Sequence, residues 1–430
     1  MIIITEIHAE DDGLIADSTL FPGVEYRLMH INNGRYKHKV HVIEANLINP
    51  GTSIAVLKAG GLNTYLEHLH IMAEKYDSVS TGRIIGAINA NFWSAYRNYP
   101  IGCTVIEGEI VEDGRYKNWS SIFFDEVSRP YIDTFELDLR LILPDRSAIK
   151  IDDVNRRRDS LQIVLYNKYY GSEIPFISSL EINHALNEAA AEHYLNMADD
   201  STESLLDTAS FLRNYKEETV LNRDEYFYKK ILLRYLDMPA VNRPYRVVIN
   251  RIDTGLIEIS DNEIIVSMGL SGDLPRLTAG DTLTVIAKTN KMSDIVFKNA
   301  VSGTPRLVRD GKADHEAYIE GSRGRRFIMH RLPRTAIGTD KLATKIIIAV
   351  VEKGSRSEGV TGASLSELAQ IMKKLGCHNA MNLDGGGSSM MFVNGDITTS
   401  KSPNNSLRKI SVGLSIIKKR GALHDIFPKK

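Results

Sequence analysis

One stretch near the C-terminal end, residues 379–395, constrains the fold and the function more than any other part of the sequence. Residues 380–383 and 390–393 have the composition of two short strands, and Asn394-Gly395 is a hairpin turn signal. Asp384 lies between these strands and is followed by three glycines and two serines. Three consecutive glycines cost chain entropy, and a fold accepts that cost where backbone turns sharply or approaches a ligand closely. The pattern indicates either a ligand-binding loop or only a tight turn.

The residues after Asp384 have the groups needed to hold an anion. Successive backbone N–H groups in a glycine-rich turn can point at one acceptor, and serine hydroxyls add further donors. A carboxylate at the entrance would place an acid or a base beside the bound anion. The predicted anion cradle consists of Gly385, Gly386, Gly387, Ser388 and Ser389.

A well-marked helix precedes this loop. Ser364 and Glu367 have the spacing of a capping box, with Ser364 as N-cap, and Gly376 is a plausible stop. Leu365, Leu368, Ala369, Met372 and Leu375 fall on one face between these signals. Strand ends that follow such helices often bind ligands in mixed α/β sheets, which favours the functional interpretation of the loop.

Length and composition exclude several classes of protein. The 430 residues allow one large domain with insertions or two domains, and a formal net charge of -1 argues against a general nucleic-acid or membrane-surface binder. Cys103 and Cys377 have no metal-ligand spacing, and we expect two buried thiols, with a single disulfide as the alternative. No stretch approaches the roughly 18 apolar residues of a membrane span.

The opening residues do not resemble a targeting segment. Met1-Ile2-Ile3-Ile4 is too short for the apolar region of a signal peptide, and acidic residues follow closely. We therefore expect no signal peptide in the given chain. The sequence leaves three locations open for the protein: the cytoplasm, a virion, or an exported form whose signal has already been removed.

Most of the chain has the β-branched pattern of strands. Residues 40–47 and 84–93 are predicted as strands, and residues 257–260 and 264–268 as a hairpin across Asp261-Asn262. From about Ser179 to Tyr235 the pattern becomes helical, Ile231-Leu232-Leu233 included, and glycines are few.

These patterns together predict an α+β fold. We expect a single large domain, rich in mixed β-sheet, whose core covers about residues 20–178 and 241–418. Residues 179–240 are predicted to be a helical insertion into that core.

Three further segments place an arginine at the edge of a predicted strand, namely Arg306, Arg334 and Arg408. Arginine holds phosphate oxygens with two N–H groups at once, although each of these residues can also pair with a surface carboxylate. Asn89 and Asn91, at the end of strand 84–93, can orient sugar hydroxyls or satisfy a turn. Three arginines in the same half of the chain as the glycine loop favour an anion site.

Other titratable residues are weaker candidates. His330 is an acid–base candidate by chemistry alone, and Glu367 is expected to act as a helix cap. Asp340 and Asp384 can coordinate a hard cation, but the sequence shows no dedicated cage. We therefore predict neither a metal nor a cofactor.

Several motifs occur in the order seen in the phosphodiester glycosidase family, which the chain resembles over about residues 86–166 and 245–417. They are Arg309-Asp310-Gly311, Pro333 to Gly338, Ser364 to Gly376, Asn382 to Ser389, and Arg408, with Ala87 to Trp93 and Pro100 to Gly102 resembling an earlier motif. The resemblance implies hydrolysis of a sugar-1-phosphodiester, similar to a GlcNAc-1-phosphodiester, in envelope or exopolysaccharide material. Such a reaction releases the sugar and leaves a phosphomonoester on the other partner.

The residues suit that reaction, and we assign catalytic roles to Asp384 and Arg334 as a hypothesis. Asp384 would be the acid, base or water-orienting group, and Arg334 would hold the phosphate with the glycine loop. The complete set of expected substrate-binding residues is Asn89, Asn91, Arg306, Thr335, Asn382, Gly385, Gly386, Gly387, Ser388, Ser389 and Arg408.

Two other classes of function remain open from the sequence. The chain can be a non-catalytic glycan- or phosphoglycan-binding module that keeps the anion cradle, or a structural protein of a virion or cell surface. In the enzyme interpretation the partner is a sugar-phosphodiester or phosphoglycan, with no nucleic acid and no membrane span. The oligomeric state is left open.

Overall fold

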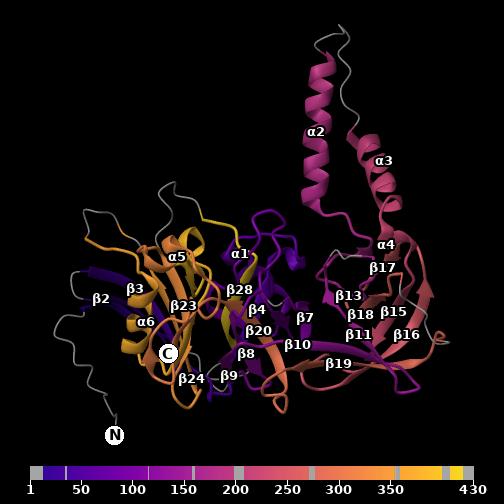
Figure 1. Cartoon of the computed structure of the whole chain (residues 1–430). Coiled ribbons are helices and arrows are strands. Elements are labelled where there is room, and N and C mark those ends of the chain that lie inside the picture. Colours follow the sequence, from indigo (N-terminus) through magenta and orange to yellow (C-terminus); the bar gives the residue numbers. More distant parts are fainter. Residues whose placement is uncertain are drawn as a thin grey trace, which may run out of the picture.

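The computed structural model describes residues 13–33, 36–114, 116–156, 160–197, 208–270, 277–352, 354, 359–399 and 407–419. Two eight-stranded sheets lie at opposite ends of the molecule in Figure 1, and two five-stranded sheets lie between them. The described chain is rich in strands and has few helices, which confirms the predicted α+β class and a single domain. The predicted division into a core and an insertion at residues 179–240 stays a prediction.

The first eight-stranded sheet is antiparallel throughout and has the order β1-β2-β3-β24-β23-β25-β21-β22. Its strands are β1 (Gly13–Phe21), β2 (Val24–Asn33), β3 (Tyr36–Asn46), β24 (Lys345–Val351), β23 (Arg334–Thr339), β25 (Asn379–Asn382), β21 (Arg306–Arg309) and β22 (Lys312–Ala313). The residues of β24 alternate between two hydrophobic cores, Ile346, Ile348 and Val350 on one face and Ile347, Ala349 and Val351 on the other. Burial on both faces explains the unbroken apolar run of this strand.

Helix α6 (Leu365–Lys374) and the short helix α5 (Arg325–Met329) cover one face of this sheet. The predicted capping box is confirmed, because Ser364 accepts from the Glu367 amide and Glu367 accepts from the Ser364 amide. Gly376 has a φ of +93°, which confirms its role as the left-handed residue after the helix.

We expect Ser364→Ala to lower the free energy of unfolding by about 1 kcal/mol, because one helix amide loses its acceptor. Urea denaturation of the two proteins measures this difference. Ser366→Ala, at an exposed position in the first turn of the helix, is the matched control and should change stability by less than about 0.5 kcal/mol. Equal stability of Ser364→Ala and the unsubstituted protein would contradict this account of the cap.

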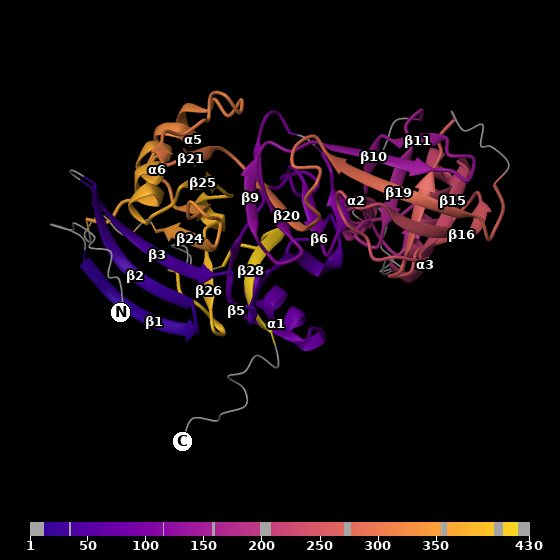
Figure 2. The ribbon, with the colours of Figure 1, turned by 90° about the horizontal axis from the view of Figure 1, so that it is seen from below.

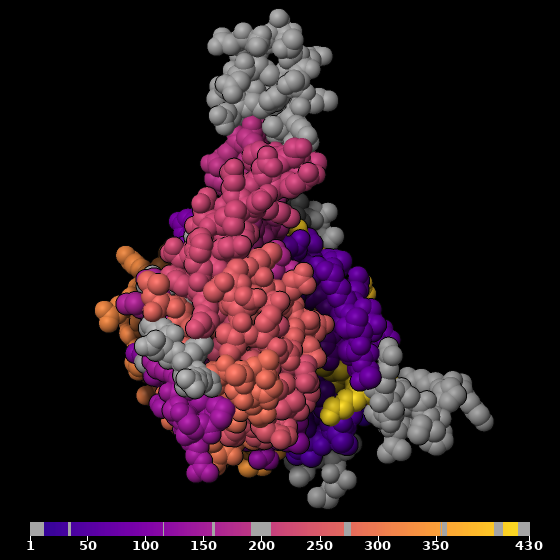
Figure 3. Space-filling model, turned by 90° about the vertical axis from the view of Figure 1, so that its right-hand side faces the viewer, coloured from indigo at the N-terminus to yellow at the C-terminus, as the bar shows by residue number. Residues whose placement is uncertain are grey.

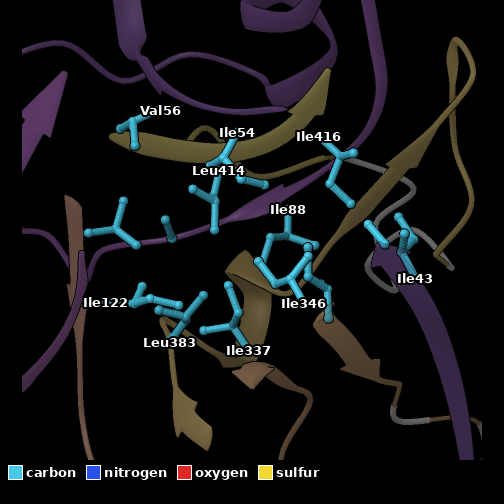
Figure 4. Close-up of a cluster of buried hydrophobic side chains, with 14 of the residues drawn as sticks. Ile43, Ile54, Val56, Ile88, Ile122, Ile337, Ile346, Leu383, Leu414 and Ile416 are labelled. Carbon is cyan, nitrogen blue, oxygen red and sulfur yellow. The ribbon is translucent and has the colours of Figure 1, made fainter. Parts of the chain in front are cut away.

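The other face of the first sheet packs on the two five-stranded sheets. One has the strands β27 (Asp396–Ile397), β26 (Met391–Val393), β5 (Gly82–Asn89), β28 (Val412–Lys419) and β4 (Thr52–Lys58), in that order. The other has the strands β7 (Glu109–Glu112), β6 (Thr104–Ile106), β20 (Phe297–Gly303), β8 (Ser120–Asp125) and β9 (Pro130–Asp133). Figure 4 shows the core where they meet, with Ile43 and Ile346 from the first sheet facing Ile88 and Leu414. Helix α1 (Leu69–Val79) covers β4 and β5 from outside.

The second eight-stranded sheet curls into a nearly closed, barrel-like form, visible on the right of Figure 2. Its strands, in spatial order, are β11 (Ala148–Ile151), β10 (Leu137–Ile142), β19 (Thr282–Thr289), β16 (Tyr245–Asp253), β15 (Lys230–Tyr235), β18 (Glu263–Ser267), β13 (Val164–Asn167) and β12 (Asp153–Val154). A hydrophobic core that includes Leu141, Leu233, Val247 and Val285 fills its interior and extends to the strands β6, β8 and β20. This core is distinct from the one under the glycine loop.

A helical arm projects beside the barrel-like sheet, as Figures 1 and 3 show. It is formed by α2 (Ser179–Met197) and α3 (Thr208–Leu221), and the short α4 (Asp224–Phe227) leads back to the sheet. The helical prediction is thus confirmed for α2 and α3. It was wrong for Ile231-Leu232-Leu233, which lie in strand β15. Because this strand is buried on both faces, its apolar run carries no alternation to distinguish it from a helix.

The predicted hairpin at residues 257–268 was also wrong. Strand β17 (Ile257–Glu258) pairs with β14 (Glu173–Ile174), whereas β18 pairs with β13 and β15. Ile257 is buried in a small core with Ile174, so long-range packing overrides pairing between chain neighbours. The hairpin at Asn394-Gly395 is confirmed by the pairing of β26 with β27.

Cys103 and Cys377 are both buried free thiols, as expected. Within the described residues, none of the helices combines the length and the apolar character needed to cross a membrane. The opening residues 1–4, on which the expectation of no signal peptide rests, lie outside the described residues.

Candidate active site

The glycine loop connects β25 of the first sheet to β26 of a five-stranded sheet, so it lies where the two sheets meet. The Asp384 amide donates to the carbonyl of Ala90 at 2.9 Å, and the Gly386 amide donates to the carbonyl of Pro333 at 2.9 Å. Gly386 has a φ of +62°, a conformation that favours glycine. The loop is thereby fixed to the end of β5 and to the start of β23.

The backbone of this loop does not form the predicted cradle of free N–H groups. Residues 386–388 form a short 3₁₀ turn, and the amides of Ser388 and Ser389 donate to the carbonyls of Gly385 and Gly386. The Gly385 amide donates to the carboxylate of Asp384. Among the five amides of residues 385–389, only that of Gly387 makes no hydrogen bond within the described part of the chain. Anion binding here must therefore come mainly from side chains.

The loop and Arg334 are in contact, as expected from the sequence. A Cβ atom added to Gly385 would lie 3.1 Å from the carbonyl oxygen of Pro333 and 3.9 Å from Cδ of Arg334. Glycine at position 385 thus allows the loop to lie directly on the first residue of β23. On the opposite side, a Cβ atom at Gly387 would lie 3.5 Å from a terminal nitrogen of Arg408. Two arginines therefore flank the acidic loop.

Arg334 is a buried cation without an acidic partner. Its side chain is 1% exposed, and it donates to the carbonyls of Ala363 (2.9 Å), Phe327 (2.6 Å) and His330 (3.2 Å). Within the described chain it forms no salt bridge, and its Nη1 makes no hydrogen bond. Burial lowers the pKa of Arg334 to about 10. A desolvated positive charge surrounded by neutral groups favours an anionic ligand.

Asp384 titrates close to neutral pH. The residue is half-buried, and burial raises the pKa of its carboxyl group to about 6. Hydrogen bonds from Ser388 and from the Gly385 amide, and the charge of Arg408, lower the pKa part of the way back. A carboxyl group with this pKa can exchange a proton near neutral pH, as a general acid or base must.

This raised pKa predicts how Asp384→Asn changes stability with pH. Because the folded-state pKa lies above the unfolded-state value, the folded protein binds a proton more tightly, and stability falls as pH rises from about 4 to about 6. The introduced amide has no charge to bury. Relative to the unsubstituted protein, Asp384→Asn should therefore become more stable as pH rises from about 4 to about 6, and the difference should stay constant at higher pH. Urea denaturation at pH 4 and pH 8 measures this, and an advantage independent of pH would contradict the assigned pKa.

Asn89 and Thr335 lie beneath the loop and hold it in place. The Asn89 amide nitrogen donates to the backbone carbonyl of Asp384 at 2.6 Å, and its oxygen accepts from Thr335 Oγ1 (2.8 Å) and the Met390 amide (3.1 Å). Both side chains are almost fully buried. Their contacts orient the loop, and those of Asn89 correspond to the turn-satisfying role expected for it.

Several buried polar atoms beside the loop have no protein partner in the described chain. Asn91 and Asn382 donate through their amide nitrogens to backbone carbonyls, but both side-chain oxygens are buried and unpaired. The hydroxyl of Ser389 is likewise buried and unpaired. An unsatisfied buried polar group costs roughly 1–3 kcal/mol, so three of them together point to a polar ligand or bound water.

Aromatic rings line the same region, and they were not predicted as a group from the sequence. The Phe92 ring lies 5.2 Å from Trp119 and 6.1 Å from Phe327 between centroids. The guanidinium of Arg334 lies 5.3 Å from the Phe327 ring, and that of Arg408 lies 5.1 Å from the Trp93 ring. Aromatic faces beside arginines suit a sugar ring linked to a phosphate. The aromatic content of residues 92–93, next to Asn89 and Asn91, was the available signal.

Arg306 is not brought to the loop. Its guanidinium donates to the Ile132 carbonyl at 2.8 Å and to the side chain of Asn379 at 2.5 Å, at the far end of β25 from Asp384. Glu367 caps α6 and pairs with Arg331, as expected for a structural residue.

Two histidines, His315 and His330, interact with Arg334 in different ways. His330 has an exposed side chain and contributes its backbone carbonyl to Arg334. His315, which was not among the predicted site residues, has a half-buried ring with an unpaired, buried Nδ1. Burial lowers the pKa of His315, and the charge of Arg334 lowers it further. No sequence signal distinguished His315 from other histidines.

Comparison with known proteins defines the class of this domain. Residues 241–417 match the family model described as phosphodiester glycosidase. This match confirms the resemblance found in the sequence and identifies the segment as a phosphodiester glycosidase domain. At the level of the family it indicates hydrolytic phosphodiester glycosidase activity. None of the curated proteins compared with the chain matches it in sequence.

Two of the solved structures compared with the chain share its fold at low sequence identity, and a third has a lower structural similarity. A hypothetical protein from Synechocystis is 19% identical, with a TM-score of 0.62, over 92% of this chain and 62% of its own. A protein from Burkholderia pseudomallei K96243 described as exported is 16% identical, with a TM-score of 0.56, over 88% and 74%. The catalytic domain of zebrafish N-acetylglucosamine-1-phosphodiester alpha-N-acetylglucosaminidase, auto-inhibited by its pro-peptide, is 15% identical, with a TM-score of 0.45, over 94% and 87%. This chain thus spans less than two thirds of the Synechocystis protein.

Proposed function

We propose that the protein hydrolyses the glycosidic bond of a sugar-1-phosphodiester similar to a GlcNAc-1-phosphodiester, in envelope or exopolysaccharide material. The observation that carries the proposal is the contact between the Asp384 loop and Arg334, a buried cation with no acidic partner in the described chain. An acid–base group thus lies beside a site that favours a phosphate. The family match of residues 241–417 supports the same class of reaction.

In the proposed reaction, the bond between the anomeric carbon and the phosphate oxygen breaks through an oxocarbenium-like state. Both electrons of that bond go to the phosphate oxygen, and water adds to the anomeric carbon and loses a proton. The products are the free sugar and a phosphomonoester. The leaving group is already anionic, so it needs cations more than a strong acid, and Arg334 and Arg408 supply them.

Asp384 acts as a carboxylate in this scheme, which is its dominant form above about pH 6. It orients the attacking water, accepts its proton and stabilises positive charge on the sugar. Asn91, Asn382 and Ser389 offer unpaired polar atoms to sugar hydroxyls, and nearby aromatic rings, such as that of Trp93, offer apolar faces. Asn89 holds the loop in register.

The direct test is turnover of the methyl diester of GlcNAc-1-phosphate by the purified full chain, followed by NMR. We expect GlcNAc and methyl phosphate in equal amounts. Binding without turnover would support the alternative of a glycan-binding module and refute the enzyme proposal. Neither binding nor turnover of this diester and its galactose and glucose analogues would refute both.

A further inference from the structure

A cavity lies at the base of the helical arm, and its lining includes no residue of the Asp384 loop. It has a volume of about 250 Å³, and its walls come from the loop at residues 96–99, from Tyr170 and Phe176, and from the first turn of α2. Cavities that hold drug-sized ligands start at roughly 300 Å³, so this one suits a single ring-sized group. Figure 1 shows where α2 rises from the body of the protein beside this region.

Aromatic side chains form the apolar part of this cavity. Tyr99, Tyr170 and Phe176 line it, and the Tyr170 and Phe176 rings lie 6.2 Å apart in an edge-to-face arrangement. Gly171 allows this packing, because a Cβ atom there would lie 2.4 Å from the Phe176 ring. Rings fixed in this way present faces and edges at little further entropic cost on binding.

Some polar groups of the cavity have no hydrogen-bond partner in the described chain. In the described chain, no protein group hydrogen-bonds the hydroxyls of Tyr99 or Tyr170. Arg223 is 10% exposed, donates to Glu181 and to the Phe176 carbonyl, and keeps a buried Nε without a partner. Glu181 neutralises Arg223, whereas the exposed Arg97 also lines the cavity and forms no ion pair in the described chain. The aromatic walls and the two phenol hydroxyls, rather than the net charge, therefore favour a neutral polar ring over a small anion.

We propose that this cavity is a second sugar-binding site, which holds one neutral pyranose ring against Tyr99, Tyr170 and Phe176. A pyranose matches the cavity because it combines apolar C–H faces for aromatic rings with hydroxyls around its edge. The free phenol hydroxyls and the Arg223–Glu181 pair then provide donors and acceptors for that edge. The site stands independently of the hydrolase proposal.

One short loop joins this cavity to the candidate active site. Trp93 lies under Arg408, and six residues later Tyr99 lines the cavity. The loop is closed on itself by hydrogen bonds from the Ser94 amide to the Tyr99 carbonyl (2.9 Å) and from the Asn98 amide to the Ser94 carbonyl (2.7 Å). A longer glycan held at this cavity would therefore be held at a fixed position relative to the Asp384 loop.

The test uses the full chain and four neutral sugars, glucose, galactose, mannose and N-acetylglucosamine, in saturation-transfer NMR titrations. We expect at least one of them to bind, and Tyr170→Phe to weaken that binding roughly five-fold by removing one hydrogen bond. Leu180→Trp should abolish it, because the half-exposed Leu180 lines the cavity and an indole would fill the space. Tyr169→Phe is the matched control, since the neighbouring Tyr169 lines a different groove, and it should change nothing.

Two comparisons separate this site from the candidate active site. Asp384→Asn should bind the same sugar with unchanged affinity, and Tyr170→Phe should hydrolyse a methyl sugar-1-phosphodiester as fast as the unsubstituted protein. The proposal is overturned if none of the four sugars binds, or if Leu180→Trp leaves the affinity of every sugar that binds unchanged. Binding of inorganic phosphate alone, abolished by Leu180→Trp, would assign the cavity to an anion and overturn it as well.

Discussion

Replacing Asp384 with Asn should lower kcat by about 10²–10⁴-fold while the protein stays folded, because the amide can neither carry charge nor exchange a proton. Asparagine has nearly the same shape, and its oxygen can still accept from the Gly385 amide, which lies 2.9 Å from the Asp384 carboxylate. Steady-state turnover of the methyl sugar-1-phosphodiester measures the effect. Folding is checked by the pH-dependent gain in stability expected for the same protein.

The matched control for this substitution is Asp340→Asn. Asp340 follows the other end of β23 from Arg334, where its carboxylate accepts from Thr344 and the Lys345 amide. The change in chemistry is the same, but Asp340 lies in a turn between strands. Because Asp340 takes no part in the proposed proton transfer, kcat should stay within about two-fold of the value for the unsubstituted protein. A folded Asp384→Asn protein with full activity would remove Asp384 from the mechanism.

The pH dependence of the unsubstituted protein gives a second measure of the same group. If the carboxylate of Asp384 is the working form, kcat/KM should rise with pH and reach half its plateau near pH 6. The acidic limb should disappear from the residual activity of Asp384→Asn. A profile that falls with increasing pH through this range would instead assign the protonated form.

Replacing Arg334 with Lys should lower kcat/KM by about 100-fold or more. One ammonium cannot reproduce a guanidinium that binds three carbonyls and has Nη1 left for the proposed phosphate. The substitution should also destabilise the protein, since buried carbonyls lose donors. Activity and urea denaturation must therefore be measured together, with activity recorded under conditions where the protein is fully folded.

Arg306→Lys separates the loss of activity from the loss of stability. Arg306 is also buried and also donates to backbone carbonyls, but its guanidinium lies at the far end of β25. Arg306→Lys should destabilise the protein about as much as Arg334→Lys does. Because Arg306 does not contact the proposed phosphate, kcat/KM of the folded protein should change by less than about three-fold. Equal losses of kcat/KM in both variants would show that Arg334 supports the fold rather than the phosphate.

The parts of the fold that depend on local signals could be predicted from the sequence. The capping box at Ser364, the stop at Gly376 and the turn at Asn394-Gly395 each depend on residues within a few positions of one another. Strand β15 could not be distinguished from a helix, because its burial on both faces is created by segments far along the chain. The residue pattern within a short segment does not reveal which distant segments pack against it.

In the candidate site, too, some features could be predicted from the sequence and others depend on distant segments. The contact of the glycine loop with Arg334 was expected from the motifs, and the structure places Gly385 against Arg334. The direction of Arg306 depends on strand register, which places its side chain toward Asn379. The cradle expectation failed because the loop closes its own amides in a 3₁₀ turn. The aromatic wall of Phe92, Trp119 and Phe327 joins three distant segments, so spacing alone could not assemble it.

The most direct test of the central claim is hydrolysis of the methyl sugar-1-phosphodiester in water enriched in oxygen-18. We expect water to attack the anomeric carbon, so the methyl phosphate released should carry no label and show a single unshifted phosphorus-31 resonance. Label in the methyl phosphate would show that water attacks phosphorus. That result would contradict a glycosidase and make Asp384 and Arg334 parts of a phosphodiesterase instead.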